Sequence, residues 1–199
     1  MISTYTELKT AIAAWLHRSD LALLAPDFIT LAEAKFNRDL RVAEMETRVT
    51  ATLDEEYEDL PSDYLEMRRL LLTGADGKVL KYVTPDVLTT YNPDSSTGSV
   101  HWYTIIGSTI QFSKVPGSLT MEMVYYARIP ALSDSNADNW LLEKHPDIYL
   151  YGALLEASPY LMNDSRIPVW SAKLTEALSS LMGADARARH SGSLTMRLA

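Results

Sequence analysis

The spacing of apolar residues changes twice along this 199-residue chain, and these changes constrain the fold more than any other feature. Up to about residue 45, apolar residues recur every three to four positions, as in an amphipathic helix. From about 46 to 129 they alternate with polar residues, as in half-buried strands. After Pro130 the helical spacing returns. The sequence therefore predicts an α+β fold: helices from 1–45 and 130–185 form one bundle, and 46–129 is a strand-rich insertion.

Helix starts and stops are marked by local signals. Thr4 is followed three residues later by a glutamate, which is capping-box spacing. Pro26 and Pro146 are favourable first-turn residues of two further helices, and the last helix is expected to stop at Gly183. The residues expected on the inner helix faces are Leu8, Ile12, Trp15, Leu16, Ile29, Ala32, Phe36, Leu40, Tyr149, Ala153, Leu154, Trp170, Leu174, Leu178 and Leu181.

Turn signals divide the middle of the chain into short strands. Asp76-Gly77 and Gly107-Ser108 each separate two apolar runs, as in hairpins. Thr84-Pro85 is typical of the cap and first residue of a short helix, which should end near Tyr91. The predicted strands begin near residue 46 and continue with 67–72, 79–83, 102–106, 109–112 and a last one around 119–125.

Composition and charge exclude several classes of protein. The formal net charge is -8, and without the three arginines of the last thirteen residues the first 186 residues carry -11. Such an acidic body lacks the clustered Lys and Arg that bind a nucleic acid backbone. The absence of cysteine excludes disulfides, thiolate zinc sites and a Cys nucleophile. We find neither a run of about 18 apolar residues nor the pattern of a secretory signal.

A search for catalytic or metal-binding motifs gives no candidate. The histidines at 17, 101, 145 and 190 have neither the mutual spacing nor the neighbouring carboxylates of a zinc motif. The segment Ser133–Asp138 lacks the glycine and glutamate of a calcium loop, so a turn and helix-cap cluster is expected there. There is no Gly-rich phosphate loop and no nucleophile elbow. We therefore expect no enzyme activity, no metal and no cofactor.

Seven carboxylates occur between residues 54 and 66 without an intervening base. The simplest interpretation is a solvated loop between two strands. A more specific one is an acidic surface that lines a channel and repels DNA, or that receives a basic partner. A catalytic pair of carboxylates is a further alternative, although nothing in the sequence sets its spacing. The candidate residues of this acidic loop are Asp54, Glu55, Glu56, Glu58 and Asp59.

The C-terminal segment 186–199 differs from the rest of the chain. It contains three arginines, no acidic side chain and a flexible Ser-Gly-Ser sequence. Its last apolar residues alternate with polar ones, so they share one face when the segment is extended. Too short to bury that face by itself, the segment suits a groove on another chain; a frayed terminus is the alternative. The candidate docking residues are Arg187, Arg189, Leu194, Met196, Arg197 and Leu198.

Several stretches, taken in order, resemble one family. The chain resembles the head-to-tail adaptor proteins of tailed bacteriophages, the family that includes the tail tubular protein A type of short-tailed phages. Each stretch alone is a packing motif of low specificity, and it is their order that carries the resemblance. They are Phe28–Arg41, Leu60–Arg68, Tyr125-Tyr126 with Ile129–Ser133, Asn139–Leu142 and Pro146–Ala157.

This resemblance implies a structural role in the virion neck. Such adaptors form a ring, usually of twelve copies, that docks below the portal protein of the filled capsid. The ring extends the DNA channel, lets double-stranded DNA pass without specific binding, and carries the tail or nozzle protein. The resemblance also implies that the C-terminal extension reaches the portal, that the chain assembles in the host cytoplasm, and that no membrane is involved.

Three other functions stay open at this stage. The chain could be another neck or tail ring component, such as a stopper or terminator. A carboxylate-dependent hydrolase would require converging, strongly perturbed carboxylates in a pocket. A monomeric binding module is the third alternative.

Overall fold

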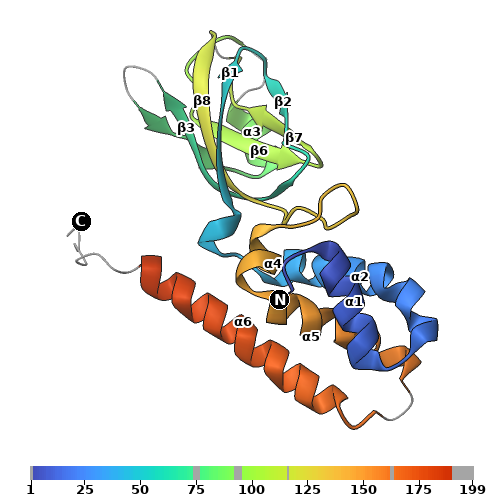
Figure 1. Cartoon of the computed structure of the whole chain (residues 1–199). Helices are drawn as coiled ribbons and strands as arrows, with labels where there is room; N and C mark the ends of the chain where they lie inside the picture. Colours follow the sequence, from blue (N-terminus) through green and yellow to red (C-terminus); the bar gives the residue numbers. More distant parts are fainter. Residues whose placement is uncertain (1, 74–76, 92–95, 116, 162–163, 190–199) are drawn as a thin grey trace. The chain divides into compact units, whose positions relative to one another are not determined.

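Helices and strands both occur in the computed structural model, so the predicted mixed composition is confirmed (Figure 1). The structure describes residues 2–73, 77–91, 96–115, 117–161 and 164–189. The chain divides into two units, which we describe separately. The helical unit contains Met1–Glu44 and Ile129–Ala199, and the β unit contains Met45–Arg128.

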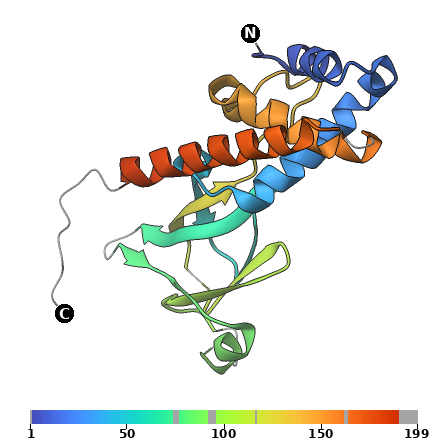
Figure 2. The same cartoon turned by 90° about the horizontal axis from the view of Figure 1, so that it is seen from below.

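The helical unit is built around contacts of α5 with α1, α2, α4 and α6. Its described elements are α1 (Tyr5–Leu16), η1 (Ser19–Leu24), α2 (Ala25–Asp39), α4 (Trp140–Lys144), α5 (Pro146–Glu156), η3 (Ser158–Tyr160) and α6 (Ile167–Arg189); η2 (Ala43–Met45) leads out of it. Nearly all the residues predicted on inner helix faces are buried, because the helices bury their apolar stripes against one another. Figures 1 and 2 show α6 as one long helix beside α5.

Three details of the helix predictions were wrong. Trp15 is 42% exposed, because Ile12 and Leu16 occupy the centre of the buried stripe and Trp15 lies at its margin. Thr4 does cap α1 by accepting from the Glu7 N–H, but the Glu7 carboxylate accepts from the Ser3 N–H rather than from that of Thr4. Finally, α6 does not stop at Gly183.

A buried carboxylate connects α2, α5 and the segment that returns from the β unit. Glu33 is only 5% exposed. Its Oε1 accepts from the backbone N–H of Leu132 (2.8 Å) and from the hydroxyl of Tyr149 (3.1 Å). The side-chain amide of Asn139 donates to the same Tyr149 oxygen (2.7 Å) and to the Pro130 carbonyl (2.7 Å). Burial raises the pKa of Glu33 above its ordinary value, and these hydrogen bonds offset only part of that effect.

Among its described residues, the β unit contains two four-stranded sheets. Its elements are β1 (Glu46–Leu53), β2 (Tyr57–Asp59), β3 (Tyr64–Thr73), β4 (Lys78–Val79), β5 (Lys81–Tyr82), α3 (Pro85–Tyr91), β6 (Trp102–Ile106), β7 (Thr109–Phe112) and β8 (Leu119–Ala127). One sheet has the order β1-β8-β3-β4 and the other β2-β7-β6-β5. Leu53, Phe112, Met121, Met123 and Tyr125 lie in a common apolar core.

The turn and helix predictions described next are confirmed, but those of the acidic loop and of one strand, 79–83, are not. The segment 79–83 contains parts of β4 and β5, which belong to different sheets, because the Leu80 N–H donates to the Leu70 carbonyl of β3 and the Lys81 N–H to the His101 carbonyl next to β6. Gly107 adopts a positive φ of 62° in the turn between β6 and β7, and α3 begins at Pro85 as expected. Residues 57–59 are not loop but strand β2, with Tyr57 opposite Gln111 of β7. Of the turn Asp76-Gly77, Asp76 lies outside the described residues.

The first prediction concerns Gly152, where α5 passes close to α2. A Cβ atom at this position would lie 2.5 Å from Phe36 Cζ and 3.1 Å from Phe36 Cε1. Helix propensity alone would make Gly152→Ala stabilising by about 1 kcal/mol. Because Phe36 is itself buried, we expect overpacking to prevail and to lower the free energy of unfolding by about 1–3 kcal/mol.

Urea denaturation measures the effect of Gly152→Ala. The control is Gly98→Ala, whose Cβ would meet nothing nearer than 3.8 Å. Adding Phe36→Leu to Gly152→Ala should restore part of the lost stability, because it removes the ring atoms in conflict. A stabilised Gly152→Ala variant would contradict the packing argument.

The second prediction concerns the pH dependence of stability. The folded state holds the Glu33 proton more tightly than the unfolded state, so this group loses stabilising effect as the pH rises from about 4.5 through its raised folded pKa. Glu33→Gln keeps an oxygen acceptor and does not ionise. The unfolding free energy of the variant relative to wild type should therefore increase between pH 4 and pH 7, as measured by urea denaturation. A difference in unfolding free energy between variant and wild type that stays constant, or that falls as the pH rises, would contradict this prediction.

Candidate interaction surfaces

The C-terminal helix α6 is fixed near both of its ends. Before its first turn, Arg166 donates from Nη1 to the Trp15 carbonyl of α1 (2.7 Å) and pairs with Asp164 (2.6 Å). Near its last turn, Asp185 Oδ1 accepts from the Ala43 N–H (2.7 Å). The buried side chains of Trp170, Leu174 and Leu181 form the inner stripe between these points. The direction in which the chain leaves α6 is therefore set by the helical unit.

This geometry shortens the predicted C-terminal tail. Arg187 and Arg189, which we expected in the tail, lie in the last turn of α6. Arg189 pairs with Asp185 four residues earlier (Nε to Oδ2, 2.7 Å). The other expected docking residues, Leu194, Met196, Arg197 and Leu198, lie outside the described residues. The helix extends past Gly183 because Asp185 bonds both to Ala43 and to the following helical turn.

The predicted acidic loop contains both exposed and buried carboxylates, and its last three residues, 57–59, form strand β2. Asp54, Glu55 and Asp59 are exposed, and Glu58 is half-buried. Glu56 is buried and accepts a hydrogen bond from Gln111 Nε2 (2.9 Å). The pKa of Glu58 is raised, first by burial and then by repulsion from Asp54, Glu55 and Asp59. The exposed carboxylates therefore act on one another, whereas Glu56 has a structural role in the sheet.

Farther along the same acidic run, Asp63 is also engaged. The hydroxyl of Tyr125 in β8 donates to Asp63 Oδ1 (2.9 Å), and the Asp63 carbonyl accepts from the Arg128 N–H (2.7 Å). Burial, reinforced by Asp63, raises the pKa of Tyr125 to about 12. Asp63 thus holds the end of β8, whereas Asp54, Glu55, Asp59 and Glu66 are the exposed carboxylates of the run.

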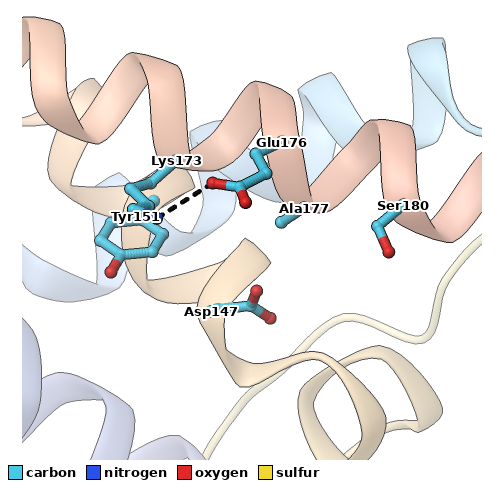
Figure 3. Close-up of a pocket in the computed structure, with 6 residues that line it drawn as sticks. All are labelled: Asp147, Tyr151, Lys173, Glu176, Ala177 and Ser180. Atoms are coloured by element: carbon cyan, nitrogen blue, oxygen red, sulfur yellow. Dashed lines mark hydrogen bonds and ion pairs between the residues drawn. The ribbon is translucent and has the colours of Figure 1, made fainter.

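A groove of about 380 Å³ lies between α5 and α6 (Figure 3). Asp147 and Tyr151 come from α5, and Lys173, Glu176, Ala177 and Ser180 from α6. Glu176 pairs with Lys173 (3.0 Å), and this hydrogen bond raises the pKa of Lys173. Among the described residues, no group of three or more acidic or histidine side chains is placed to hold a metal ion. The groove therefore resembles an ordinary contact between two packed helices.

A second groove of about 560 Å³ lies where α1 ends and α6 begins. Leu16, His17, Tyr160 and Arg166 are among its lining residues. The exposed ring of Tyr160 packs against Phe28, with the ring centroids 5.5 Å apart. The charged side chains of this groove are again paired, since Arg166 binds Asp164. Neither groove can be recognised in the sequence, because each combines residues that are distant in the chain.

One comparison with known families extends over nearly the whole chain. The model of a family described as SU10 adaptor protein matches residues 3–197. A search of curated proteins found no match. The family match includes both units, α6 and most of the segment that follows it.

The third prediction concerns the anchor of α6. Asp185→Ala removes the acceptor for the Ala43 N–H and the partner of Arg189, and should lower the free energy of unfolding by about 1–3 kcal/mol. Hydrogen exchange should become faster at Ala43 and at residues 186–189. Asp185→Asn keeps an oxygen acceptor, so it should preserve the protection at Ala43. Equal loss of that protection in both variants would mean that charge, rather than the hydrogen bond, holds the helix end.

Proposed function

The chain belongs to the SU10 adaptor protein family, and we propose that it is a phage head-to-tail adaptor that forms a ring under the portal protein. Membership in a family of phage adaptors carries this proposal, and it implies a structural protein located in the virion neck. The finer details are part of the proposal: a ring of twelve copies of the tail tubular protein A type, which extends the DNA channel and carries the tail or nozzle.

The described residues support a structural role. In the two grooves described above, Lys173 pairs with Glu176 and Arg166 pairs with Asp164, which suits packing surfaces better than a reacting centre. In the part of the chain that the structure describes, no helix has the length and apolarity needed to cross a bilayer. In this proposal the helical unit is the bundle of the adaptor, and residues 46–129 are an insertion in it.

The anchored helix α6 supports a docking role for the segment that follows it. Because Arg166 and Asp185 fix the two ends of the helix, residues 190–199 start from a defined point on each copy. Leu194, Met196 and Leu198 share one face of that segment when it is extended. We propose that this face, together with Arg187, Arg189 and Arg197, enters a groove on the portal protein.

The fourth prediction tests this docking segment. A chain truncated after Arg189 keeps the whole of α6 but lacks the alternating residues, so it should lose at least about tenfold in affinity for purified portal protein. Replacing Leu194, Met196 and Leu198 by Asp should have a similar effect. Replacing the alternate residues Ser193 and Thr195 by Ala is the matched control and should leave binding nearly unchanged.

Isothermal calorimetry or mass photometry with portal rings measures the difference. The thermal unfolding of each variant should match that of wild type, because the changes lie beyond the end of α6. Full affinity in the chain truncated after Arg189 would reject docking by the tail. If the wild-type chain itself fails to bind portal protein, the adaptor function is rejected instead.

A further inference from the structure

The β unit exposes several large apolar side chains that are close together in the sequence. Val79, Tyr82, Val87 and Tyr91 are 52%, 55%, 41% and 48% exposed, and all lie in the short segment formed by β4, β5 and α3. A cluster of exposed apolar residues framed by charged ones is typical of a protein–protein interface.

This surface is held in place by the sheet beneath it. Tyr91 stacks on Trp102 of β6, with ring centroids 4.2 Å apart and planes at 15°. Trp102 is also the neighbour of Lys81 in the β5–β6 pair, and Tyr82 meets Tyr103 edge-on at 5.8 Å. Anchored aromatic side chains lose little conformational entropy when a partner binds. The rings therefore suit an interface in their present conformation.

Positive charge borders these aromatic residues. Lys81 is exposed in β5, and Lys78 of β4 contacts the ring of His101. Asp86, in the first turn of α3, is the one acidic residue among the described positions of this segment. We call the set Lys78, Val79, Lys81, Tyr82, Val87 and Tyr91 the basic edge.

At the opposite edge of the sheet β2-β7-β6-β5, exposed apolar side chains are accompanied by negative rather than positive charge. Tyr57 of β2 and Ile106 of β6 are 53% and 55% exposed, and Tyr57 is held by a hydrogen bond from Gln111 Nε2 to its hydroxyl oxygen (3.0 Å). The exposed carboxylates of residues 54–59 lie on or beside β2. We call the set Asp54, Glu55, Tyr57, Glu58, Asp59 and Ile106 the acidic edge.

The centres of the two edges lie on the first and last strands of one sheet, with Tyr57 and Asp59 on β2 and Lys81 and Tyr82 on β5. Lys78 and Val79 of the basic edge belong to β4 of the other sheet, and Ile106 of the acidic edge is the last residue of β6. In the order β2-β7-β6-β5, three strand spacings of about 4.8 Å separate β2 from β5. Strands β2 and β5 are therefore about 14 Å apart and form opposite edges of this sheet. Each combines exposed apolar side chains with charge, and the charges are of opposite sign.

We propose that the acidic edge of one copy of this chain binds the basic edge of the next copy. The inference rests on the proposed ring and names the surfaces that build it. Two different, complementary surfaces make a head-to-tail contact, and such a contact closes into a ring when each copy turns by a fixed angle, about 30° for twelve copies. Surfaces at opposite edges of one sheet can make such a head-to-tail contact with the copies on either side.

Repulsion among the carboxylates of the isolated chain also favours a second copy of the chain as the partner. Asp54, Glu55 and Asp59 repel the half-buried carboxylate of Glu58, so the acidic edge carries unfavourable energy until a cation approaches. Lys81 of a second copy would relieve that repulsion, while Tyr57 and Tyr82 would bury apolar ring surface. The same carboxylates would then face a protein partner rather than passing DNA.

The fifth prediction uses charge reversal on each edge. Asp59→Lys and Lys81→Glu should each raise the protein concentration needed for ring formation, alone or on portal protein, by at least about tenfold, since like charges then oppose each other. An equimolar mixture of the two variants should recover rings, because each reversed edge meets its complement. Asp39→Lys, an exposed reversal at the end of α2, is the matched control.

Cross-linking gives a second readout that does not depend on charge. The chain has no cysteine, so Tyr57→Cys and Tyr82→Cys introduce unique thiols. Chains carrying the first change should form disulfides with chains carrying the second, more readily than either forms with itself. Native mass spectrometry and non-reducing gels detect the rings and the mixed dimers.

The outcomes separate the two proposals. Loss of rings in each single reversal, with recovery in the mixture and mixed disulfides, supports the edge contact. Wild-type rings that persist in both reversals and give no mixed disulfides overturn the edge contact and leave the adaptor function in place. A wild-type chain that forms no ring, with or without portal protein, overturns the ring itself.

Discussion

The helical unit depends on one buried acceptor, Glu33 Oε1. It receives hydrogen bonds from the backbone of Leu132 and the hydroxyl of Tyr149, and Asn139 extends the network to Pro130. A carboxylate buried to this degree would be strongly destabilising without such donors. The network therefore selects the arrangement in which α2, α5 and the returning chain meet, and alternatives would leave the carboxylate unsatisfied.

The same arrangement determines where α6 lies and what it can present. α5 packs against both α2 and α6, so the position of α6 follows from the α2–α5 packing at Gly152 and Phe36. Arg166 and Asp185 then fix its ends to α1 and to the chain after α2. A terminal segment that starts from a fixed helix reaches its partner with less loss of entropy than one attached to a mobile element.

Features that depend on neighbours in the sequence could be predicted. The start of α3 at Pro85 and the turn at Gly107 follow from backbone preferences of one or two residues. The inner helix faces follow from the helical period, with Trp15 as the exception because periodicity does not define the margin of a buried stripe.

Features that depend on distant partners could not be predicted. Glu33 has the sequence context of a surface glutamate, and its donors Leu132 and Tyr149 are 99 and 116 residues away. Strand β2 forms in an acidic run because Tyr57 pairs with Gln111. α6 passes Gly183 because Asp185 bonds to Ala43, 142 residues earlier. Of the proposed contact, the sequence indicates the acidic carboxylates, but it does not reveal the basic edge, because the positions of Tyr82 and Tyr91 depend on their packing against Tyr103 and Trp102.

The net charge of the chain connects the proposed edge contact with the passage of DNA. The carboxylates at residues 54, 55, 56, 58 and 59 account for more than half of the net charge of -8. Glu56 is already buried, and the head-to-tail contact would cover the others with lysine from the next copy. Without these five carboxylates and the two lysines of the basic edge, each copy still carries a net charge of -5. In such a ring, DNA would pass copies that keep a net negative charge, and it would therefore be held only weakly.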